Sequence, residues 1–267
     1  MRRSSKSVCM TVLALSGAAV LWIGVTRAQA PPARAQPRGA PGRGPSVTAK
    51  KHLLVIGMTL GYRHGSTSDG MAMFWELGEE SGVYDTEMRT DMKWVTKKQP
   101  GEGETHSLPF FDAIVFMNCT SVTREKGGWN LDAEQKEALL SFVRDDGKGL
   151  VVAHASIDAN YAKYLRLVDE MYSPREWSRD KVNVPMRLDE SKLDYVNPQY
   201  GVKATRPDKD QAIAWSKMYG KGRVFYSSLG HTKEAFADPD VRKMYLESVK
   251  WALGKTEGSV APHPKVN

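Results

Sequence analysis

Three short and almost continuous apolar runs place the strongest limit on what this chain can fold into. The runs are HLLVIGM (52–58), FFDAIVFMN (110–118) and LVVAHA (150–155). A strand that is apolar at successive positions is covered on both faces, which is typical of parallel sheets with helices above and below them. The runs therefore predict three buried strands of an α/β fold.

The segments between and after these runs predict helices and outer strands. Amphipathic patterns with Ser or Asp at the start and Gly at the end indicate helices over 66–82, 131–149 and 238–254. The other expected strands are a short edge strand at 84–91, a strand at 183–189, and a hairpin at 212–219 and 223–229. This order of elements predicts a doubly wound, mainly parallel sheet with helices on both faces.

The first 48 residues are expected to lie outside this domain. Residues 1–30 combine a basic start, an apolar stretch and a small-residue site, a pattern typical of a secretory signal peptide cleaved after about Ala30. An uncleaved membrane anchor is the alternative, because the apolar stretch is close to the minimum for a membrane span. Residues 31–48 are rich in Pro, Gly and Arg and predict a disordered tether. We expect a folded domain at 49–255, a flexible tail at 256–267, and export to the periplasm or the extracellular space without membrane attachment after cleavage.

The charge balance and the cysteines narrow the class of function. The chain has 38 Lys and Arg residues against 31 Asp and Glu residues, a net charge of +7. The first 48 positions hold seven basic residues and no acidic residue, so the folded domain is formally neutral and lacks the basic footprint of a nucleic-acid-binding protein. Cys9 leaves with the signal peptide, and Cys119 then has no partner for a disulfide.

Three histidines share one position relative to the expected strands. His64, His154 and His231 each lie at or just after the carboxyl end of an apolar strand, where open α/β sheets bind their ligands. Imidazole titrates near neutral pH and suits proton transfer or metal binding. We expect the three residues to form one catalytic site, with Asp158 orienting an imidazole or acting on the substrate. The alternative is that each histidine has only a structural role at its strand end.

Other features of the sequence bear on ligands and cofactors. Asn118 and Thr120 follow the second apolar run, where an amide and a hydroxyl could bind sugar hydroxyls, although ordinary turn chemistry is the alternative. The sequence has no phosphate-binding loop, no dinucleotide-binding fingerprint and no nucleophile elbow, so we expect no cofactor. Three histidines could hold zinc, but no close-spaced pair such as H-x-x-x-H supports a metal, and none is expected.

Several motifs resemble the ThuA-like family, which is named for trehalose utilisation. In chain order they are GYRHGS, AIVFMNCT, LDAEQKEALLSFVRDDGKGLVVAHASID, DEMYS and AIAWSKMYGKGRVFYSSLGHT. The resemblance spans nearly all of residues 51–254 and implies a flavodoxin-like sheet similar to that of class I glutamine amidotransferases. It also implies that glutamine hydrolysis has been lost. His154 and Ala155 stand where an amidotransferase would have its nucleophilic Cys, and Cys119 follows a different strand.

The resemblance implies a function in carbohydrate catabolism, by hydrolysis or elimination on disaccharides or (keto-)glycosides. A keto group acidifies the neighbouring C–H bond, so a base of near-neutral pKa can remove that proton and expel the glycosidic oxygen. We expect His154 to be the base and His64 or His231 to be the acid or the oxyanion donor. The expected binding residues for the small sugar or glycoside are Arg63, Glu170 and Tyr172.

One departure from the family separates the functional alternatives. The segment between Asp158 and Asp169 is much shorter than in the family and lacks its His-Pro element. Retention of the three histidines favours an enzyme, whereas the short segment favours a non-catalytic module that binds a carbohydrate or a protein partner. A metal-dependent hydrolase is a third alternative.

Overall fold

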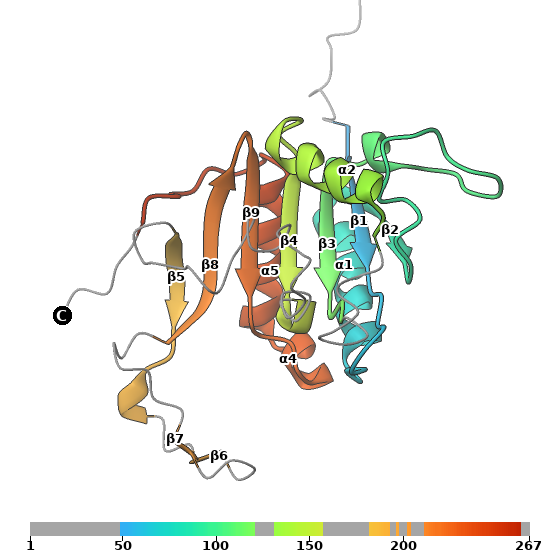
Figure 1. The fold of residues 1–267 in the computed structure, drawn as a ribbon. Coiled ribbons are helices and arrows are strands. Elements are labelled where there is room, and N and C mark those ends of the chain that lie inside the picture. Colours follow the sequence, from blue (N-terminus) through green and yellow to red (C-terminus); the bar gives the residue numbers. More distant parts are fainter. Residues whose placement is uncertain are drawn as a thin grey trace, which may run out of the picture. The chain divides into compact units, whose positions relative to one another are not determined.

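Seven strands of the described residues form one twisted sheet (Figure 1). In spatial order they are β2 (Tyr84–Arg89), β1 (Lys51–Ile56), β3 (Ala113–Met117), β4 (Gly149–Ala153), β9 (Gly222–Ser227), β8 (Ala212–Tyr219) and β5 (Asn183–Arg187). The structure is a computed structural model that describes residues 49–120, 131–156, 182–192, 196–197, 202–203 and 211–262.

Five neighbouring strands of this sheet run parallel, and two antiparallel strands complete one edge. β1 pairs with β2 and β3, β3 pairs with β4, and β4 pairs with β9, all in parallel. β8 is antiparallel to both β9 and β5. The order of the five parallel strands is that of flavodoxin-like sheets, in which the topological switch point lies between β1 and β3. The predicted fold class, a mainly parallel and doubly wound α/β sheet, is confirmed.

Helices cover both faces of the sheet, and each face has its own apolar core. α1 (Thr67–Ser81), α4 (Lys233–Ala237) and α5 (Pro239–Ala252) lie on one face, and α2 (Ala133–Arg144) lies on the other (Figure 1). Successive residues of β1 alternate between the two cores. Leu53 and Val55 share a core with α1 and α5, whereas Leu54 and Ile56 share a core with α2. This alternation explains why the strand is apolar at every one of these positions.

The smaller elements lie outside these layers. They are the 3₁₀ helices η1 (Leu108–Phe110) and η3 (Glu190–Lys192) and the ribbon of β6 (Val196–Asn197) and β7 (Val202–Lys203). The strand expected from residue 110 begins only at Ala113, because Pro109 in η1 forms a tight turn in place of the first strand residues. The short helix α4 was not predicted, since five residues are too few to show a helical repeat.

Two of the three expected helix caps are confirmed. Asp132 and Gln135 form a capping box at the start of α2, and the Asp238 carboxylate accepts hydrogen bonds from the backbone of Asp240 and Val241 at the start of α5. Ser66 stands at the N-cap position of α1, but its side chain makes no capping hydrogen bond. The Ser66 hydroxyl instead donates to the carbonyl oxygens of Gly230 and His231.

The predicted signal peptide and tether, residues 1–48, lie outside the described residues. Within the described part of the chain, no helix combines the length and the apolar character needed to cross a bilayer.

A largely buried carboxylate joins three strands at the amino-terminal edge of the sheet. Asp112 accepts hydrogen bonds from the backbone N–H of His52 (3.1 Å) and from Nζ of Lys51 (3.1 Å) and Lys148 (3.0 Å). Burial by itself would raise the pKa of Asp112, but these three donors outweigh it and hold the pKa below the ordinary value of 3.8. The ionised carboxylate therefore stabilises the folded state.

Asp112→Asn is expected to lower the free energy of unfolding by about 1–3 kcal/mol at neutral pH, because hydrogen bonds to an ionised group are lost. Since the folded-state pKa lies below the unfolded-state pKa, this stability is fully present above the unfolded-state value. It is lost as pH falls through the folded-state value. Urea unfolding at neutral pH and near pH 3 measures the difference in the free energy of unfolding between the wild type and Asp112→Asn. This difference should be smaller in acid. Asp85→Asn is the matched control, because Asp85 forms an exposed ion pair with Lys50 and exposed pairs contribute little. A difference that stays constant with pH would contradict the assignment to Asp112.

Candidate active site

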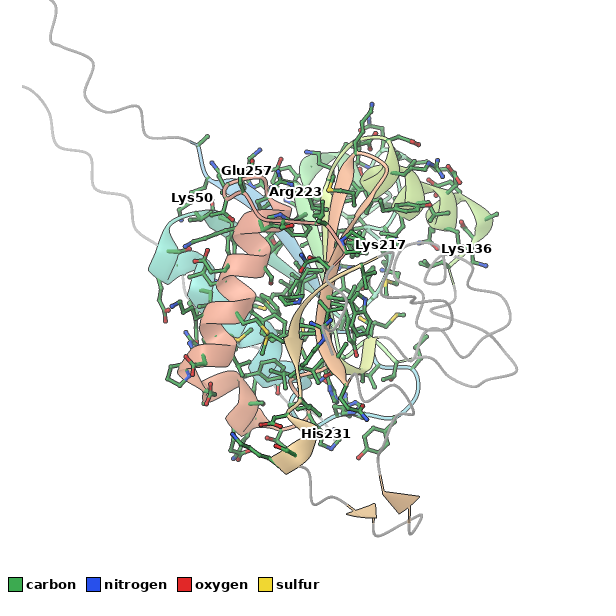
Figure 2. The ribbon with its side chains drawn as sticks, turned by 90° about the vertical axis from the view of Figure 1, so that its left-hand side faces the viewer. Lys50, Lys136, Lys217, Arg223, His231 and Glu257 are labelled. Carbon is green, nitrogen blue, oxygen red and sulfur yellow. The ribbon has the colours of Figure 1, made fainter. Side chains whose placement is uncertain are left out.

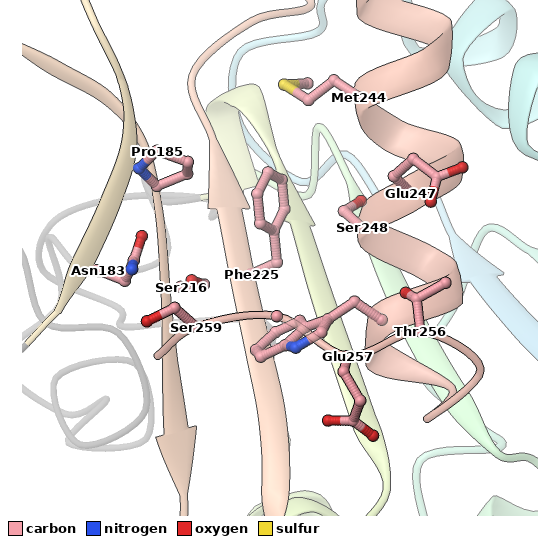
Figure 3. A pocket seen from close by; sticks show the side chains of 12 residues that line it. Asn183, Pro185, Ser216, Phe225, Met244, Glu247, Ser248, Thr256, Glu257 and Ser259 are labelled. Atoms are coloured by element: carbon pink, nitrogen blue, oxygen red, sulfur yellow. The ribbon is translucent and has the colours of Figure 1, made fainter. Parts of the chain in front are cut away.

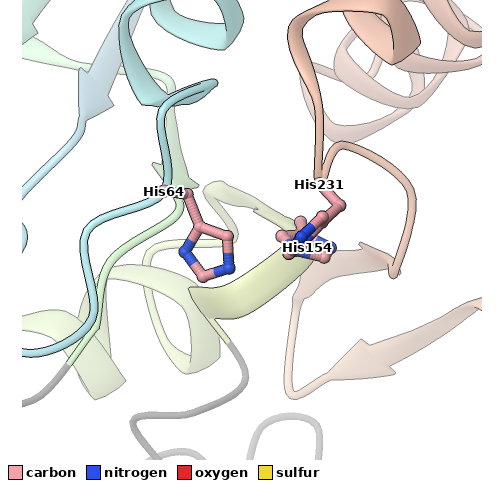
Figure 4. Close-up of side chains that lie close together, drawn as sticks. All are labelled: His64, His154 and His231. Atoms are coloured by element: carbon pink, nitrogen blue, oxygen red, sulfur yellow. The ribbon is translucent and has the colours of Figure 1, made fainter. Parts of the chain in front are cut away.

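The three predicted histidines meet at the carboxyl edge of the sheet (Figure 4). His64 lies in the loop between β1 and α1, His154 follows β4 directly, and His231 lies in the loop between β9 and α4. The ring centroids are 4.9 Å apart for His64 and His154, 5.2 Å for His64 and His231, and 5.1 Å for His154 and His231. Figure 2 shows His231 at the opposite end of the sheet from Arg223, which lies near the start of β9. The three residues, here called the histidine cluster, therefore lie at the edge where flavodoxin-like sheets bind ligands.

His154 and Asn118 have left-handed backbone conformations at the ends of neighbouring strands. The φ angle is 49° at His154, directly after β4, and 50° at Asn118, directly after β3. Among the described residues, these two are the only residues other than glycine with positive φ. This region is disfavoured for residues with a Cβ, although Asn and His enter it more readily than most. Strained turns of this kind concentrate at functional sites, and His154 occupies the place that the family resemblance assigned to the lost nucleophile.

The hydrogen-bond partners of His154 determine its tautomer. Nδ1 of His154 lies 2.6 Å from the carbonyl oxygen of Ser228, and Nε2 lies 3.1 Å from Nδ1 of His231. A carbonyl oxygen can only accept, so Nδ1 of His154 donates and the neutral ring has its lone pair on Nε2. The tautomer of His154 is thus assigned from the atom that its Nδ1 contacts, the carbonyl oxygen of Ser228. The lone pair of His154 is therefore directed into the cluster.

His64 is the most buried member of the cluster. It is 8% exposed, and among the described residues its Nδ1 has no hydrogen-bond partner. Burial lowers the pKa of His64 to about 4, with smaller contributions from His154 and His231. His64 is thus neutral at physiological pH and keeps a lone pair. The exposed ring of Tyr62 packs against it edge to face, with centroids 4.8 Å apart.

A buried polar network holds the loops that bear the histidines. The Ser66 hydroxyl shares its hydrogen between the carbonyl oxygens of Gly230 (2.8 Å) and His231 (3.0 Å). Nδ2 of Asn118 donates to Ser66 Oγ (3.1 Å), and Oδ1 of Asn118 accepts from the backbone N–H of Ala155 (3.3 Å). Ser66 and Asn118 therefore connect the segments next to His64, His154 and His231. One role predicted from the sequence needs correction here: the Ser66 side chain links loops and does not cap α1.

Asn118 and Thr120, which are expected to bind sugar hydroxyls, are buried. Asn118 is 0% exposed and Thr120 is 2% exposed. Thr120 Oγ1 donates to the carbonyl oxygen of Tyr62 (3.0 Å) and accepts from the N–H of Gly61 (3.3 Å). Both side chains are thus bonded to neighbouring loops in this structure, and their binding of sugar hydroxyls stays a prediction.

Arg63, which is expected to bind substrate, is exposed beside the cluster. It lines a cavity of about 470 Å³ together with His64, Gly65, Thr67 and Thr90. This cavity lies between the carboxyl ends of β1 and β2 and the start of α1. Arg63 is therefore available to a ligand that also reaches His64, and its role in binding stays a prediction.

A second cavity, of about 440 Å³, lies between α5 and the antiparallel edge of the sheet (Figure 3). Phe225, Met244 and Trp251 line it together with the carboxylates of Glu247 and Glu257. Its lining contains no histidine, so the cavity beside Arg63 is the one that adjoins the candidate chemistry.

Cys119 has the properties of a structural residue. Its side chain is 0% exposed, its Sγ lies 3.0 Å from the carbonyl oxygen of Ile56, and its backbone N–H donates to Ser156 Oγ. Burial raises the pKa of the thiol to about 12, so the nucleophilic thiolate is not formed near neutral pH. Cys119 is therefore not placed or ionised as a nucleophile in this structure.

Three predicted site residues, Asp158, Glu170 and Tyr172, lie outside the described residues, as does the short segment that joins Asp158 to Asp169. Their roles stay predictions. The sequence reasoning missed the carbonyl oxygen of Ser228, because a backbone acceptor carries no side-chain signal.

The strand order and the position of the site define the class of protein: a flavodoxin-like α/β domain with its candidate site at the carboxyl ends of parallel strands. A sequence model of the ThuA family, described as trehalose utilisation, matches residues 162–252. The match supports, over this part of the chain, the resemblance to the ThuA-like family that the motifs indicated.

Comparison with solved structures agrees with this fold. A protein from Bacteroides uniformis ATCC 8492, described as ThuA-like, has a TM-score of 0.53 at 16% identity over 82% of this chain and 98% of that chain. Another ThuA-like protein, from Parabacteroides merdae ATCC 43184, has a TM-score of 0.47 at 15% identity over 79% and 93% of the two chains. A cytoplasmic protein from Salmonella typhimurium has a TM-score of 0.41 at 14% identity over 76% and 98%. A search of curated proteins found no match.

Proposed function

We propose that this ThuA-like protein is exported and cleaves keto-glycosides or disaccharides at the histidine cluster. The observation that carries the proposal is the convergence of three imidazoles from three separate strands. The description of the family as trehalose utilisation supports a sugar substrate. Export rests on the signal-peptide pattern of residues 1–30, and the boundaries of the folded domain at 49–255 rest on composition.

The reaction has two proton transfers and one bond cleavage. A base removes the proton from the carbon between the keto group and the anomeric carbon, and the electron pair forms an enediolate. The enediolate then expels the glycosidic oxygen, which takes a proton as the C–O bond breaks. The other product is an unsaturated keto sugar, and addition of water to its double bond completes a net hydrolysis. A donor near the keto oxygen lowers the barrier by stabilising the developing negative charge.

The cluster contains groups suited to these steps. His154 is the first candidate for the base, because the lone pair of its Nε2 is directed into the cluster and its Nδ1–H is held by Ser228. His231 is exposed and can exchange protons with solvent. His64 or His231 supplies the acid or the oxyanion donor, and Arg63 beside the cavity binds the sugar.

A turnover assay with a 3-keto-disaccharide tests the proposal. We expect the protein to release a free monosaccharide and His154→Ala to lower kcat/KM by at least about 100-fold, since general base catalysis contributes about 10²–10⁴-fold. His106→Ala is the matched control, because His106 stacks on Phe110 outside the cluster. Melting temperatures with and without sugar complete the test. If sugars stabilise the wild-type protein and His154→Ala equally and neither turns over the keto-sugar, the protein is a non-catalytic binding module.

A further inference from the structure

We propose that His64, His154 and His231 bind one divalent transition-metal ion of the Zn²⁺ type and leave at least one coordination position open. The proposal goes beyond the proposed function, because metal binding requires no sugar. It rests on three observations. One nitrogen from each ring lies close to the other two, the rings of His154 and His231 have identified hydrogen-bond partners, and the ring of His64 is buried.

The positions of the ring nitrogens fit one small ion. One nitrogen from each ring can be chosen so that all three lie within 4.8 Å of one another, and Nε2 of His154 lies 3.1 Å from Nδ1 of His231. Zn–N bonds of about 2.0–2.1 Å in a tetrahedral site place ligand nitrogens about 3.3 Å apart. The His154 and His231 pair is therefore already near the required separation. The other separations are at most 4.8 Å and thus exceed the required separation by about 1.5 Å or less.

The orientation of the rings favours a shared ion over stacking. The three ring planes make angles of 88°, 84° and 69° with one another, and Figure 4 shows the His64 ring beside the rings of His154 and His231, which overlap in this view. Rings at these angles are not stacked in parallel, and one nitrogen of each ring lies within 4.8 Å of the others.

The partner of His154 is the kind that accompanies a metal ligand. Histidine ligands usually donate their second ring N–H to a carbonyl or a carboxylate, which fixes the ring and its tautomer. Nδ1 of His154 makes such a hydrogen bond to the carbonyl oxygen of Ser228 at 2.6 Å. The Ser66 and Asn118 network then holds the loops of His64 and His231 in place.

Hydrogen bonds within the histidine cluster do not explain why an imidazole is buried at position 64. Its ring is 8% exposed, and Nδ1 has no partner among the described residues. A buried polar atom without a partner destabilises a fold, so retention of an imidazole at this position needs a compensating interaction. A bond from one nitrogen of this ring to a metal ion supplies one. Three neutral imidazoles suit Zn²⁺, Ni²⁺ or Co²⁺, whereas Mg²⁺ and Ca²⁺ require oxygen ligands.

A bound ion would change how the proposed reaction proceeds. The ion and a proton compete for the same lone pair on Nε2 of His154, so His154 cannot serve as the base in the metal-loaded protein. The ion would instead stabilise the negative charge that develops on the keto oxygen. The metal content therefore decides between the two routes.

Calorimetric titration of the tag-free, chelator-treated protein with Zn²⁺ tests the proposal. We expect one ion per chain and a higher melting temperature. His231→Ala should weaken the affinity by more than about 100-fold, because loss of even an outer partner weakens metal sites by about 10–100-fold. His231 is exposed, so this variant should keep the wild-type fold, which circular dichroism checks. His64→Gln is the second variant, and His106→Ala is the control with an unchanged affinity.

The outcomes separate the two proposals. Titration with Mg²⁺ should give no binding, and Co²⁺ should give the visible absorption of a nitrogen-ligated ion that is lost in His231→Ala. No binding of Zn²⁺, or binding that is equal in the wild type, His231→Ala and His64→Gln, overturns the metal site. If Zn²⁺ binds as expected but no keto-glycoside is turned over, the metal site stands and the proposed function fails. If turnover persists at the full rate without any metal, the sugar chemistry stands and the ion has no part in it.

Discussion

Asn118→Ala is expected to lower the free energy of unfolding by about 2–4 kcal/mol. The Asn118 side chain is fully buried and bonded at both ends, to Ser66 Oγ and to the N–H of Ala155. Its loss leaves a buried backbone donor without an acceptor, which costs about 1–3 kcal/mol. The backbone also has a φ of 50°, which alanine tolerates less well than asparagine by about 1 kcal/mol. Urea unfolding monitored by tryptophan fluorescence measures the sum.

Two further variants separate these causes. Asn118→Gly should recover only the part of the lost free energy of unfolding that is due to backbone conformation, because glycine accepts positive φ but its side chain offers no hydrogen bond. Asn183→Ala is the matched control at a partly exposed site, where the amide donates to the carbonyl oxygen of Ala261 among the described residues, and its effect should stay below about 1 kcal/mol. Equal losses for Asn118→Ala and Asn183→Ala would show that the buried network does not hold the site together.

Gly230→Ala is expected to lower the free energy of unfolding by about 2–4 kcal/mol and to displace the adjacent His231. The φ of Gly230 is 127°, a region that residues with a Cβ avoid at a cost of about 1–3 kcal/mol. A Cβ there would also lie 2.4 Å from Cζ of Phe236. The Phe236 ring is 2% exposed and packs between α1 and α5, so it cannot move away without disturbing the core.

Gly82→Ala is the control for Gly230→Ala. Gly82 ends α1 with a φ of 64°, and nothing lies within 4 Å of a Cβ added there. Its replacement should therefore cost only about 1 kcal/mol for the left-handed backbone and leave the histidine cluster unchanged. Urea unfolding of both variants gives the stability difference, and a crystal structure of Gly230→Ala shows the position of His231. If the two variants lose equal stability, crowding against Phe236 has no effect.

The fold was predictable because its evidence is local. An apolar residue at every position of β1 requires a core on each face, and the structure places Leu53 and Leu54 in two different cores. The capping residues Asp132 and Asp238 also act within one helical turn. Such patterns depend on neighbours in the chain.

The candidate site was predictable only in part. The parallel topology brings every strand end to one edge, so the convergence of His64, His154 and His231 could be expected from their shared position after apolar strands. The roles of Ser66 and Asn118 could not be expected, because their partners lie 164 and 52 residues away in the chain. The sequence pattern favoured a helix cap and a ligand-binding amide, and tertiary contacts used both groups to join loops.

The same distinction applies to the metal. The absence of an H-x-x-x-H pair argued against a metal site, but that argument holds only for ligands that share one helix. Histidines from three strands need no fixed spacing in the chain. The amino-acid sequence by itself determined the doubly wound sheet and the edge on which the histidines lie, because periodicity and strand direction are encoded locally. Only the tertiary structure decided that one nitrogen from each of the three rings lies within 4.8 Å of the others, because loop paths and buried hydrogen bonds between distant residues set that geometry.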